Sequence, residues 1–244
     1  EYNDCFFEDL PPRIRRRINE QTIIAYLIRS GTPEKVRTSI FTRINTGGLT
    51  LTPAEIKNSV YRGKAANLLK ELAYSEEFKK ATRGKIDTSR MLDCEFVNRF
   101  LAFYILGIDK YKGNLEDYLN DALIAVKNAP DGEIQGYKDG FLRAMKYASL
   151  IFEDKAFRRI NKNGNYGQIN KPLFDAVSVN LARLDVIECE MLVSQKDRLL
   201  AEYENILRNT KFIQIITNGT AKFVNVRKRH DTIYRLFKEN IKND

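Results

Sequence analysis

The spacing of apolar residues predicts a short mixed segment followed by a long run of helices. Residues 22–28, Thr-Ile-Ile-Ala-Tyr-Leu-Ile, are rich in β-branched and aromatic side chains and end at Ser30-Gly31, as a strand would. Just upstream, Pro11-Pro12 is expected to prevent a helix. Because a lone strand cannot satisfy its own backbone groups, we expect it to pair with polypeptide upstream of Glu1 or with another chain.

Two helix starts and a glycine turn follow this strand. Thr32-Pro33 and Thr52-Pro53 each combine an N-cap residue with a proline at the first helical position. Glu55 stands three residues after Thr52, the position of a capping box. Between the two starts, Gly47-Gly48 can supply the left-handed residue that ends a helix. The sequence therefore predicts a helix, a tight turn and a second helix.

The rest of the chain has mostly helical periodicity. The pattern predicts a fully buried helix over residues 90–106 and amphipathic helices elsewhere, with a loop at 161–167 and a turn at 215–220. The other expected helices cover 64–80, 114–127, 137–160, 171–184, 194–207 and 224–241. The expected fold class is therefore mainly α. It divides into a partial α+β front segment, residues 1–63, and a multi-helix domain, residues 64–244.

The charge balance fits either an anionic partner or a surface that is merely soluble. The 244 residues carry 41 Lys and Arg against 32 Asp and Glu, a formal charge of +9, and this sign favours nucleic acid, nucleotides or an anionic surface. No apolar run approaches the roughly 20 residues that span a bilayer, and there is no signal peptide, so we expect a cytoplasmic protein that does not bind membranes. The chain does not begin with Met, which we interpret as a fragment or a processed chain.

Cysteine and histidine usage narrows the chemistry. The three Cys are far apart and the single His is His230, which argues against zinc sites, a disulfide framework and the His-rich HNH nuclease centre. Such cysteine usage fits a reducing cytoplasm. We predict no metal site in this chain, and we place His230 at a solvated helix start without a catalytic role.

The turn between the two front helices is the segment that can bind a ligand. Arg43 and Asn45 stand at the end of one helix, Gly47 and Gly48 permit close backbone approach, and Thr52 opens a helix whose free N–H groups favour an anion. Arg43 can hold a phosphate with two hydrogen bonds. The same residues also fit an ordinary C-cap followed by an ordinary helix start, so composition and spacing leave both interpretations open.

The segment from Phe41 to Gly63, Phe-Thr-Arg-Ile-Asn-Thr-Gly-Gly-Leu-Thr-Leu-Thr-Pro-Ala-Glu-Ile-Lys-Asn-Ser-Val-Tyr-Arg-Gly, resembles the signature of the GmrSD-type family of bacterial defence proteins. Residues 169–180 and 212–236 are similar to later blocks of the same family. The resemblance implies a ParB/sulfiredoxin-like fold for the front segment. The family hallmark Asp-Gly-Gln-Gln-Arg, which precedes this signature, is absent here, as is the His-rich nuclease domain that many members carry.

The resemblance implies a component that binds and hydrolyses a nucleoside triphosphate, with or without Mg²⁺, and thereby controls DNA cleavage during restriction of modified phage DNA. Arg43 and Asn45 would contact phosphate, Gly47 and Gly48 would let the backbone approach it, and Glu55 would cap a helix or orient a water molecule. The expected partners are the nucleotide, DNA and a nuclease domain or subunit. Because the Asp-Gly-Gln-Gln-Arg segment is absent, we expect this chain to be incomplete for catalysis.

Two further basic clusters suggest a different role. Arg227, Lys228 and Arg229 precede a helical stretch, and Arg158 and Arg159 adjoin a loop, so both clusters are candidates for nucleic-acid contact. The alternative function is therefore a non-catalytic helical module that binds DNA or a partner protein, and a structural scaffold is a third possibility. A third cluster, Arg13, Arg15, Arg16 and Arg17, could contact a nucleic-acid backbone. We slightly favour the alternative, a solvated strand edge whose charges deter pairing.

Overall fold

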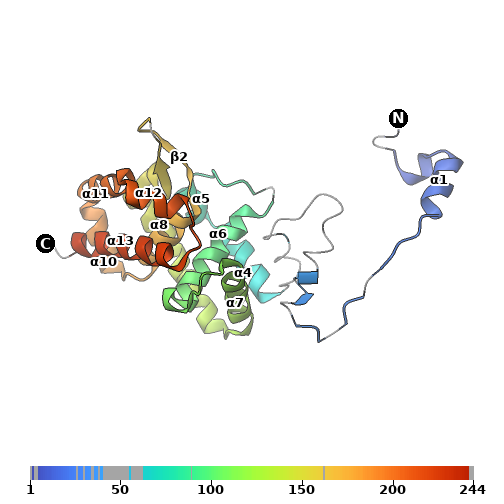
Figure 1. Ribbon diagram of the computed structural model, residues 1–244, viewed down its shortest axis with the longest axis horizontal. Helices are drawn as coiled ribbons and strands as arrows, with labels where there is room; N and C mark the ends of the chain where they lie inside the picture. The colour runs from blue at the N-terminus through green and yellow to red at the C-terminus, as the bar shows by residue number, and fades with distance from the viewer. Residues whose placement is uncertain are drawn as a thin grey trace.

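A computed structural model gives the architecture of a mainly helical protein (Figure 1). It describes residues 2, 5–25, 27–29, 31–33, 36, 37, 39, 40, 55, 63–88, 90–161 and 163–241. The helical body contains α4 (Lys64–Ala73), α5 (Glu76–Thr82), α6 (Leu92–Leu101), α7 (Leu115–Asn128), α8 (Asp131–Phe152), α9 (Lys171–Ala182), α10 (Val186–Ser194), α11 (Lys196–Arg208), α12 (Thr210–Thr217) and α13 (Phe223–Ile241). Short 3-10 turns occur at Phe7–Asp9, Ile108–Lys110 and Glu153–Lys155.

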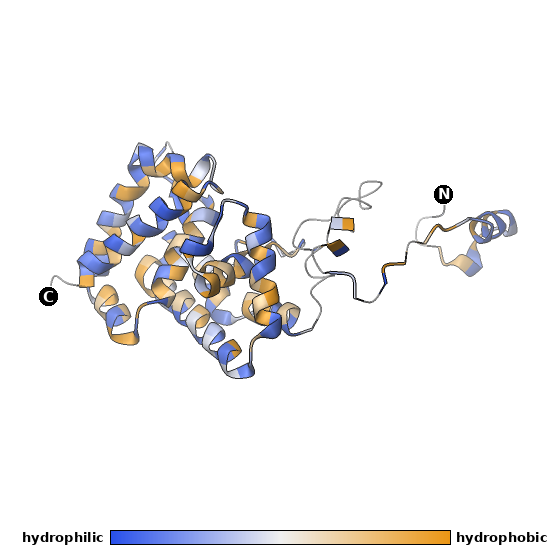
Figure 2. Ribbon diagram, turned by 60° about the horizontal axis from the view of Figure 1, so that its bottom comes forward, coloured by the Kyte–Doolittle hydropathy of each residue, from blue (hydrophilic) through white to orange (hydrophobic). Residues whose placement is uncertain are grey.

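Helix α9 is the centre of the body. Every residue of α9 after Lys171 is buried, so the helix is enclosed on all sides, although it carries the polar residues Asp175, Ser178 and Asn180. It packs against α8, α13 and α6. Phe174 makes edge-to-face contacts with Phe96 of α6 and with Phe157, at centroid distances of 5.0 and 4.7 Å. Figure 2 shows this arrangement, with hydrophobic residues gathered toward the inside of the body.

The helix expected over residues 90–106 is present as two joined pieces. Helix α6 continues into a π-helical turn, Ala102–Leu106. Tyr104 of this turn approaches Gly140 of α8 so closely that a Cβ on Gly140 would lie 2.7 Å from the tyrosine oxygen. A larger residue at position 140 would therefore have to displace the Tyr104 side chain where the widened turn meets α8. The prediction of a buried helix here is correct in position.

Several boundaries differ from those predicted. The helix expected over 64–80 breaks at Ser75, whose hydroxyl accepts the backbone N–H of Phe78 and so begins α5. The helix expected over 137–160 begins six residues earlier, at Asp131, with Pro130 as the N-cap residue of α8, and it ends at Phe152. Of the stretch expected to turn at 215–220, residues 215–217 are the end of α12 and residues 218–220 form the turn. The helix expected over 114–127 is confirmed as α7, and Asn114 caps it by accepting the N–H of Asp117.

The expected loop at 161–167 is the tip of a two-stranded hairpin. Strands β1 (Arg158–Ile160) and β2 (Tyr166–Ile169) are antiparallel, with Arg158 opposite Ile169 and Ile160 opposite Tyr166. The sequence pattern placed residues 158–160 in a helix, and this was wrong. Just before β1, the buried Phe157 packs its ring against Phe174 of α9.

The N-terminal residues correct two expectations. Residues Pro12–Asn19 form a helix, α1, with Pro12 in its first turn, where a missing N–H costs nothing. The double proline therefore starts a helix rather than preventing one. In the expected strand, residues 22–25 and 27 and 28 are outside any strand, and Ile23 and Leu27 are 87% and 92% exposed. Figure 1 shows α1 apart from the helical body.

Candidate functional site

Most of the predicted nucleotide corner lies outside the described residues. Arg43, Asn45, Gly47, Gly48 and Thr52 all belong to this set, so their expected contacts stay predictions. Glu55 is described, and its Oε2 accepts a hydrogen bond from the Arg90 guanidinium at 3.0 Å. The Glu55 side chain is 23% exposed. One oxygen of the predicted catalytic carboxylate is thus held by the residue that lies two positions before α6.

Arg229 is buried, whereas the sequence placed it in a solvated basic cluster. It is 1% exposed, its Nη1 donates to the carbonyl oxygen of Thr220 at 2.6 Å, and its Nη2 lies 3.4 Å from Asp175 Oδ2. Asp175 also receives both arms of Arg99, with an Nε to Oδ1 distance of 2.9 Å and a second hydrogen bond to Oδ2. Arg229 therefore serves the interior and is not a surface contact for nucleic acid.

This polar cluster carries one more positive charge than negative. Burial lowers the pKa of Arg229 to about 10 although Asp175 opposes the shift. Burial also lowers the pKa of Arg99, but the charge and hydrogen bonds of Asp175 outweigh it and leave the pKa raised. Both guanidinium groups therefore stay charged at neutral pH. The bidentate geometry explains the difference, since Asp175 faces Arg99 directly and Arg229 only at the edge.

His230 is also buried, which corrects its expected place at a solvated helix start. It is 1% exposed and its ring packs 5.1 Å from the ring of Phe103. Neither ring nitrogen has a hydrogen-bond partner within the described part of the chain. Burial, followed by the charges of Arg229, Arg183 and Arg99, holds the pKa of His230 well below its usual range. The imidazole is therefore neutral and packs as an aromatic ring.

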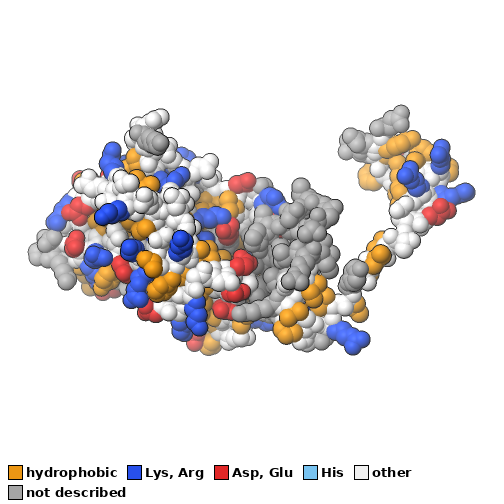
Figure 3. Space-filling view, viewed as in Figure 1, with side chains coloured by type: hydrophobic (Ala, Val, Ile, Leu, Met, Phe, Trp, Pro, Cys, Tyr) orange, Lys and Arg blue, Asp and Glu red, His pale blue; other side chains and the backbone are white. Residues whose placement is uncertain are grey.

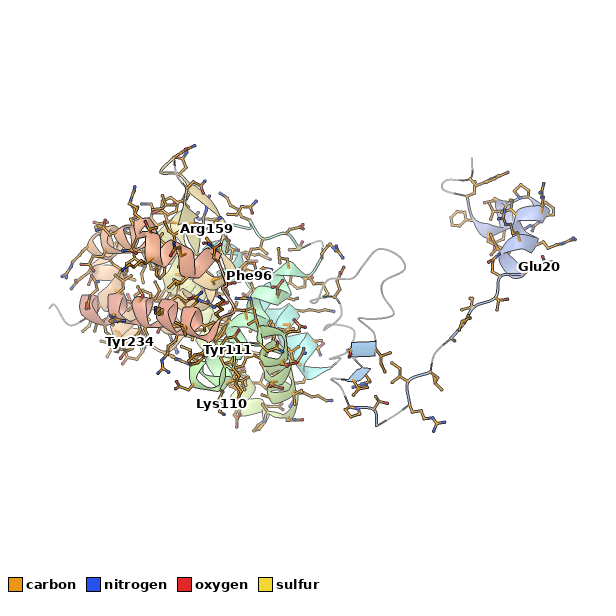
Figure 4. The ribbon with its side chains drawn as sticks, viewed as in Figure 1. Glu20, Phe96, Lys110, Tyr111, Arg159 and Tyr234 are labelled. Atoms are coloured by element: carbon orange, nitrogen blue, oxygen red, sulfur yellow. The ribbon has the colours of Figure 1, made fainter. Side chains whose placement is uncertain are left out.

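Of the predicted nucleic-acid contacts Arg158 and Arg159, the first is occupied by contacts within the protein and the second is exposed. The guanidinium of Arg158 donates to the carbonyl oxygens of Gly167, Tyr166 and Asp154 at 2.6, 3.0 and 3.0 Å. It stabilises the hairpin and has little capacity left for a ligand. Arg159 is exposed on β1 and is labelled in Figure 4. Tyr166, beside them, donates its hydroxyl to Glu204 at 2.7 Å, so it anchors the hairpin to α11.

Positive charge in the helical body is concentrated in one stretch. Residues 205–235 contain seven Lys or Arg and one Asp, whereas the remainder of residues 64–244 contains 24 of each sign. The entire charge excess of the body therefore lies between the end of α11 and the middle of α13. Figure 3 shows acidic and basic side chains interspersed over the face of the body that it draws. The sequence does carry this signal: a count of charges over long segments reveals the basic stretch, whereas short clusters of Lys and Arg do not.

These residues border an open groove of about 1120 Å³ between α11, α12 and α13. Three lining cations, Lys211, Lys228 and Arg235, are exposed and have no carboxylate partner among the residues whose structure is described. Five carboxamides and an apolar floor complete the lining; they are Asn205, Asn209, Gln214, Asn218 and Asn225 above Ile206, Phe212 and Ile215. Only Asp231 adds a negative charge to the lining.

The rest of the predicted surface cluster flanks this groove. Lys228 lines it, and Arg227 is exposed nearby with its Nη2 3.6 Å from Asp109 Oδ1. Within the described ranges no group of three or more His, Cys, Asp or Glu is placed to hold a metal ion. In the same ranges no helix is long and apolar enough to cross a membrane.

Comparisons with protein-family models, with curated proteins and with solved structures gave no match for this chain.

Proposed function

We propose that the helical body binds nucleic acid through the surface formed by residues 205–235. The observation that carries this proposal is the charge distribution. Apart from the buried Arg229, residues 205–235 carry six exposed Lys and Arg side chains against one Asp, whereas the rest of residues 64–244 carries equal numbers of the two signs. Three of these exposed cations border a groove without an acidic partner among the described residues. Cations that are not neutralised internally are the groups that contact phosphates and release counterions.

Salt-dependent binding tests this function. We expect the protein to bind labelled oligonucleotides, with an affinity that falls linearly on a log–log plot against salt concentration. Fluorescence anisotropy at several salt concentrations measures both quantities. A slope near zero, or no binding to either single-stranded or duplex DNA at low salt, contradicts the proposal. Polyglutamate of similar length is the control, since a surface suited to nucleic acid should not bind an acidic polypeptide equally well.

A second function concerns the front segment. We propose that residues 41–63 bind a nucleoside triphosphate, with or without Mg²⁺, as part of a component that controls DNA cleavage in a GmrSD-type restriction system. The support is the sequence resemblance together with one contact. Glu55 bonds to Arg90 at the edge of α6, so a ligand at this corner would be coupled to the body, where we place the DNA surface.

Ligand binding and turnover test the second function separately. A triphosphate that binds only the folded protein must raise its melting temperature, and we expect Arg43→Ala to remove that rise. Arg15→Ala, which also removes one arginine from the front segment, is the control. Phosphate release by the full-length protein, with and without DNA, then distinguishes hydrolysis from binding alone. If no triphosphate changes the melting temperature and no phosphate is released, this function is excluded.

A further inference from the structure

The groove between α11, α12 and α13 has a shape and a lining that select among nucleic acids. Its volume of about 1120 Å³ exceeds the roughly 300–1,000 Å³ usual for a small-molecule pocket, and the groove is open to solvent. Such a site suits a chain-like ligand more than a single small molecule. The inference below rests on the proposed nucleic-acid function and narrows it to one form of ligand.

Two carboxamides on the groove are oriented by the fold. Asn209 caps α12, so its Oδ1 accepts the backbone N–H groups of Lys211 and Phe212 at 2.9 and 3.1 Å. Because that oxygen is engaged, the Nδ2 amino group remains for a ligand. Asn225 is held in the opposite sense, since its Nδ2 donates to the carbonyl oxygens of Asn218 and Gly219 at 3.1 and 3.0 Å. Its Oδ1 is left as an acceptor.

The fixed donor of Asn209 and the fixed acceptor of Asn225 can hydrogen-bond to the edge of a nucleobase, and the apolar residues beside them can contact its face. The floor residues Ile206 and Ile215 offer apolar surface for the base, and Lys228 and Arg235 offer charge for the phosphates. A duplex presents base edges only inside its own grooves, which convex elements such as helices enter. A concave site reaches base edges only where the strand is unpaired. We therefore propose that this groove binds single-stranded nucleic acid, with bases over the carboxamides and phosphates on the lysine and arginine side chains.

The first experiment compares ligands. Fluorescence anisotropy with the full chain and labelled oligonucleotides of equal length, single-stranded and duplex, should show at least tenfold tighter binding of the single strand. Duplex binding as tight as single-strand binding, or tighter, overturns this inference but leaves the proposed nucleic-acid function intact. Absence of binding to both forms overturns both.

The second experiment assigns the surface. The double variant Lys228→Gln, Arg235→Gln should weaken single-strand binding at least tenfold and reduce the log–log salt slope by about 1.4, from two lost phosphate contacts. The matched control, Lys80→Gln with Lys85→Gln, removes the same charge from exposed positions near α5 and should change affinity less than threefold. Equal losses in the two double variants would show that only net charge matters, and would overturn the assignment to the groove.

The third experiment tests the oriented donor. Asn209→Ser keeps an oxygen that can cap α12 and removes the amino group, so we expect several-fold weaker binding at an unchanged melting temperature. Asn114→Ser makes the same change at the cap of α7, away from the groove, and should leave binding unaltered. If Asn209→Ser binds as tightly as the wild type to oligonucleotides of every base, the carboxamides do not contact bases and the inference fails.

Discussion

Arg229 and its neighbour Lys228 are adjacent cations on α13 with opposite roles. Arg229 points inward to Asp175 and Thr220, whereas Lys228 is exposed on the groove. The polar interior and the basic groove are therefore built from the same short stretch of helix. The contrast teaches that a run of like charges is not one functional unit, because a helix turns about 100° per residue and sends neighbours to different environments.

The largest effect should come from breaking the interior. Asp175→Asn removes the one negative charge that Arg99 and Arg229 share, and breaking a buried ion pair from one side costs about 3–5 kcal/mol. Chemical denaturation measures this loss of unfolding free energy. The control is Asp109→Asn, whose carboxylate is 87% exposed and pairs with Arg227, and it should change stability by less than about 0.5 kcal/mol. Similar losses of unfolding free energy in the two variants would show that the buried ion pair is no more important than the exposed one.

The second effect is on pH dependence. The folded protein keeps His230 neutral because its pKa is lowered by burial, whereas the unfolded chain takes up a proton below the usual histidine pKa of about 6.5. Stability should therefore be intact above that pH and fall by up to about 1.4 kcal/mol per unit below it, or about 2 kcal/mol between pH 6.5 and 5.

Denaturation at a series of pH values measures this slope. His230 is the only histidine, so His230→Phe, which keeps an aromatic ring beside Phe103, should flatten the profile in that interval. A variant that retains the full slope would show that other groups cause it.

A smaller effect is expected when the excess charge itself is removed. Arg229→Met leaves Arg99 and Asp175 as a neutral pair and fills similar volume, and such replacements of buried charges are often close to neutral. We expect a change within about 1 kcal/mol, with the lost hydrogen bond to Thr220 setting its sign. A loss as large as that of Asp175→Asn would mean that Arg229 is as strongly coupled to the carboxylate as Arg99.

The smallest effect on stability belongs to the groove. Lys228→Gln should alter the free energy of unfolding by less than about 0.5 kcal/mol, because the side chain is exposed and has no acidic partner among the described residues. The same variant should weaken binding of single-stranded DNA. Both quantities should be measured in both variants. If Lys228→Gln lowered the free energy of unfolding more than Asp175→Asn did, and Asp175→Asn weakened DNA binding more, the contrast between interior and groove would be wrong.

Sequence patterns predicted the elements whose signals are local. Asn114 begins α7 and Lys171-Pro172 begin α9 because a cap or a proline acts within one helical turn. The sequence pattern predicted the wrong element where a residue's contacts are different from those assumed. Pro11-Pro12 was interpreted as a break although Pro12 is well placed in a first turn, and residues 158–160 were extended into a helix although Arg158 binds carbonyl oxygens across a hairpin.

The candidate site was predictable only in part. Lys228 was identified from its cluster. Arg235 lies two helical turns further along the same face of α13, whereas Lys211 meets them only because α12 packs against α13. The carboxamides Asn209 and Asn225 carry no sequence signal for binding, since their orientation comes from caps and carbonyls that the turn between the helices provides.

The amino-acid sequence by itself determined that this protein is mainly helical and basic, because hydrophobic periodicity and net charge are properties of the chain in any conformation. Only the tertiary structure decided which cations face water. Arg229 and His230 were assigned to the surface by their polar neighbours, yet both are buried, because Asp175 arrives from α9 and Phe103 from the end of α6. Burial of a charge depends on what packs against it, and that partner lies more than 50 residues away.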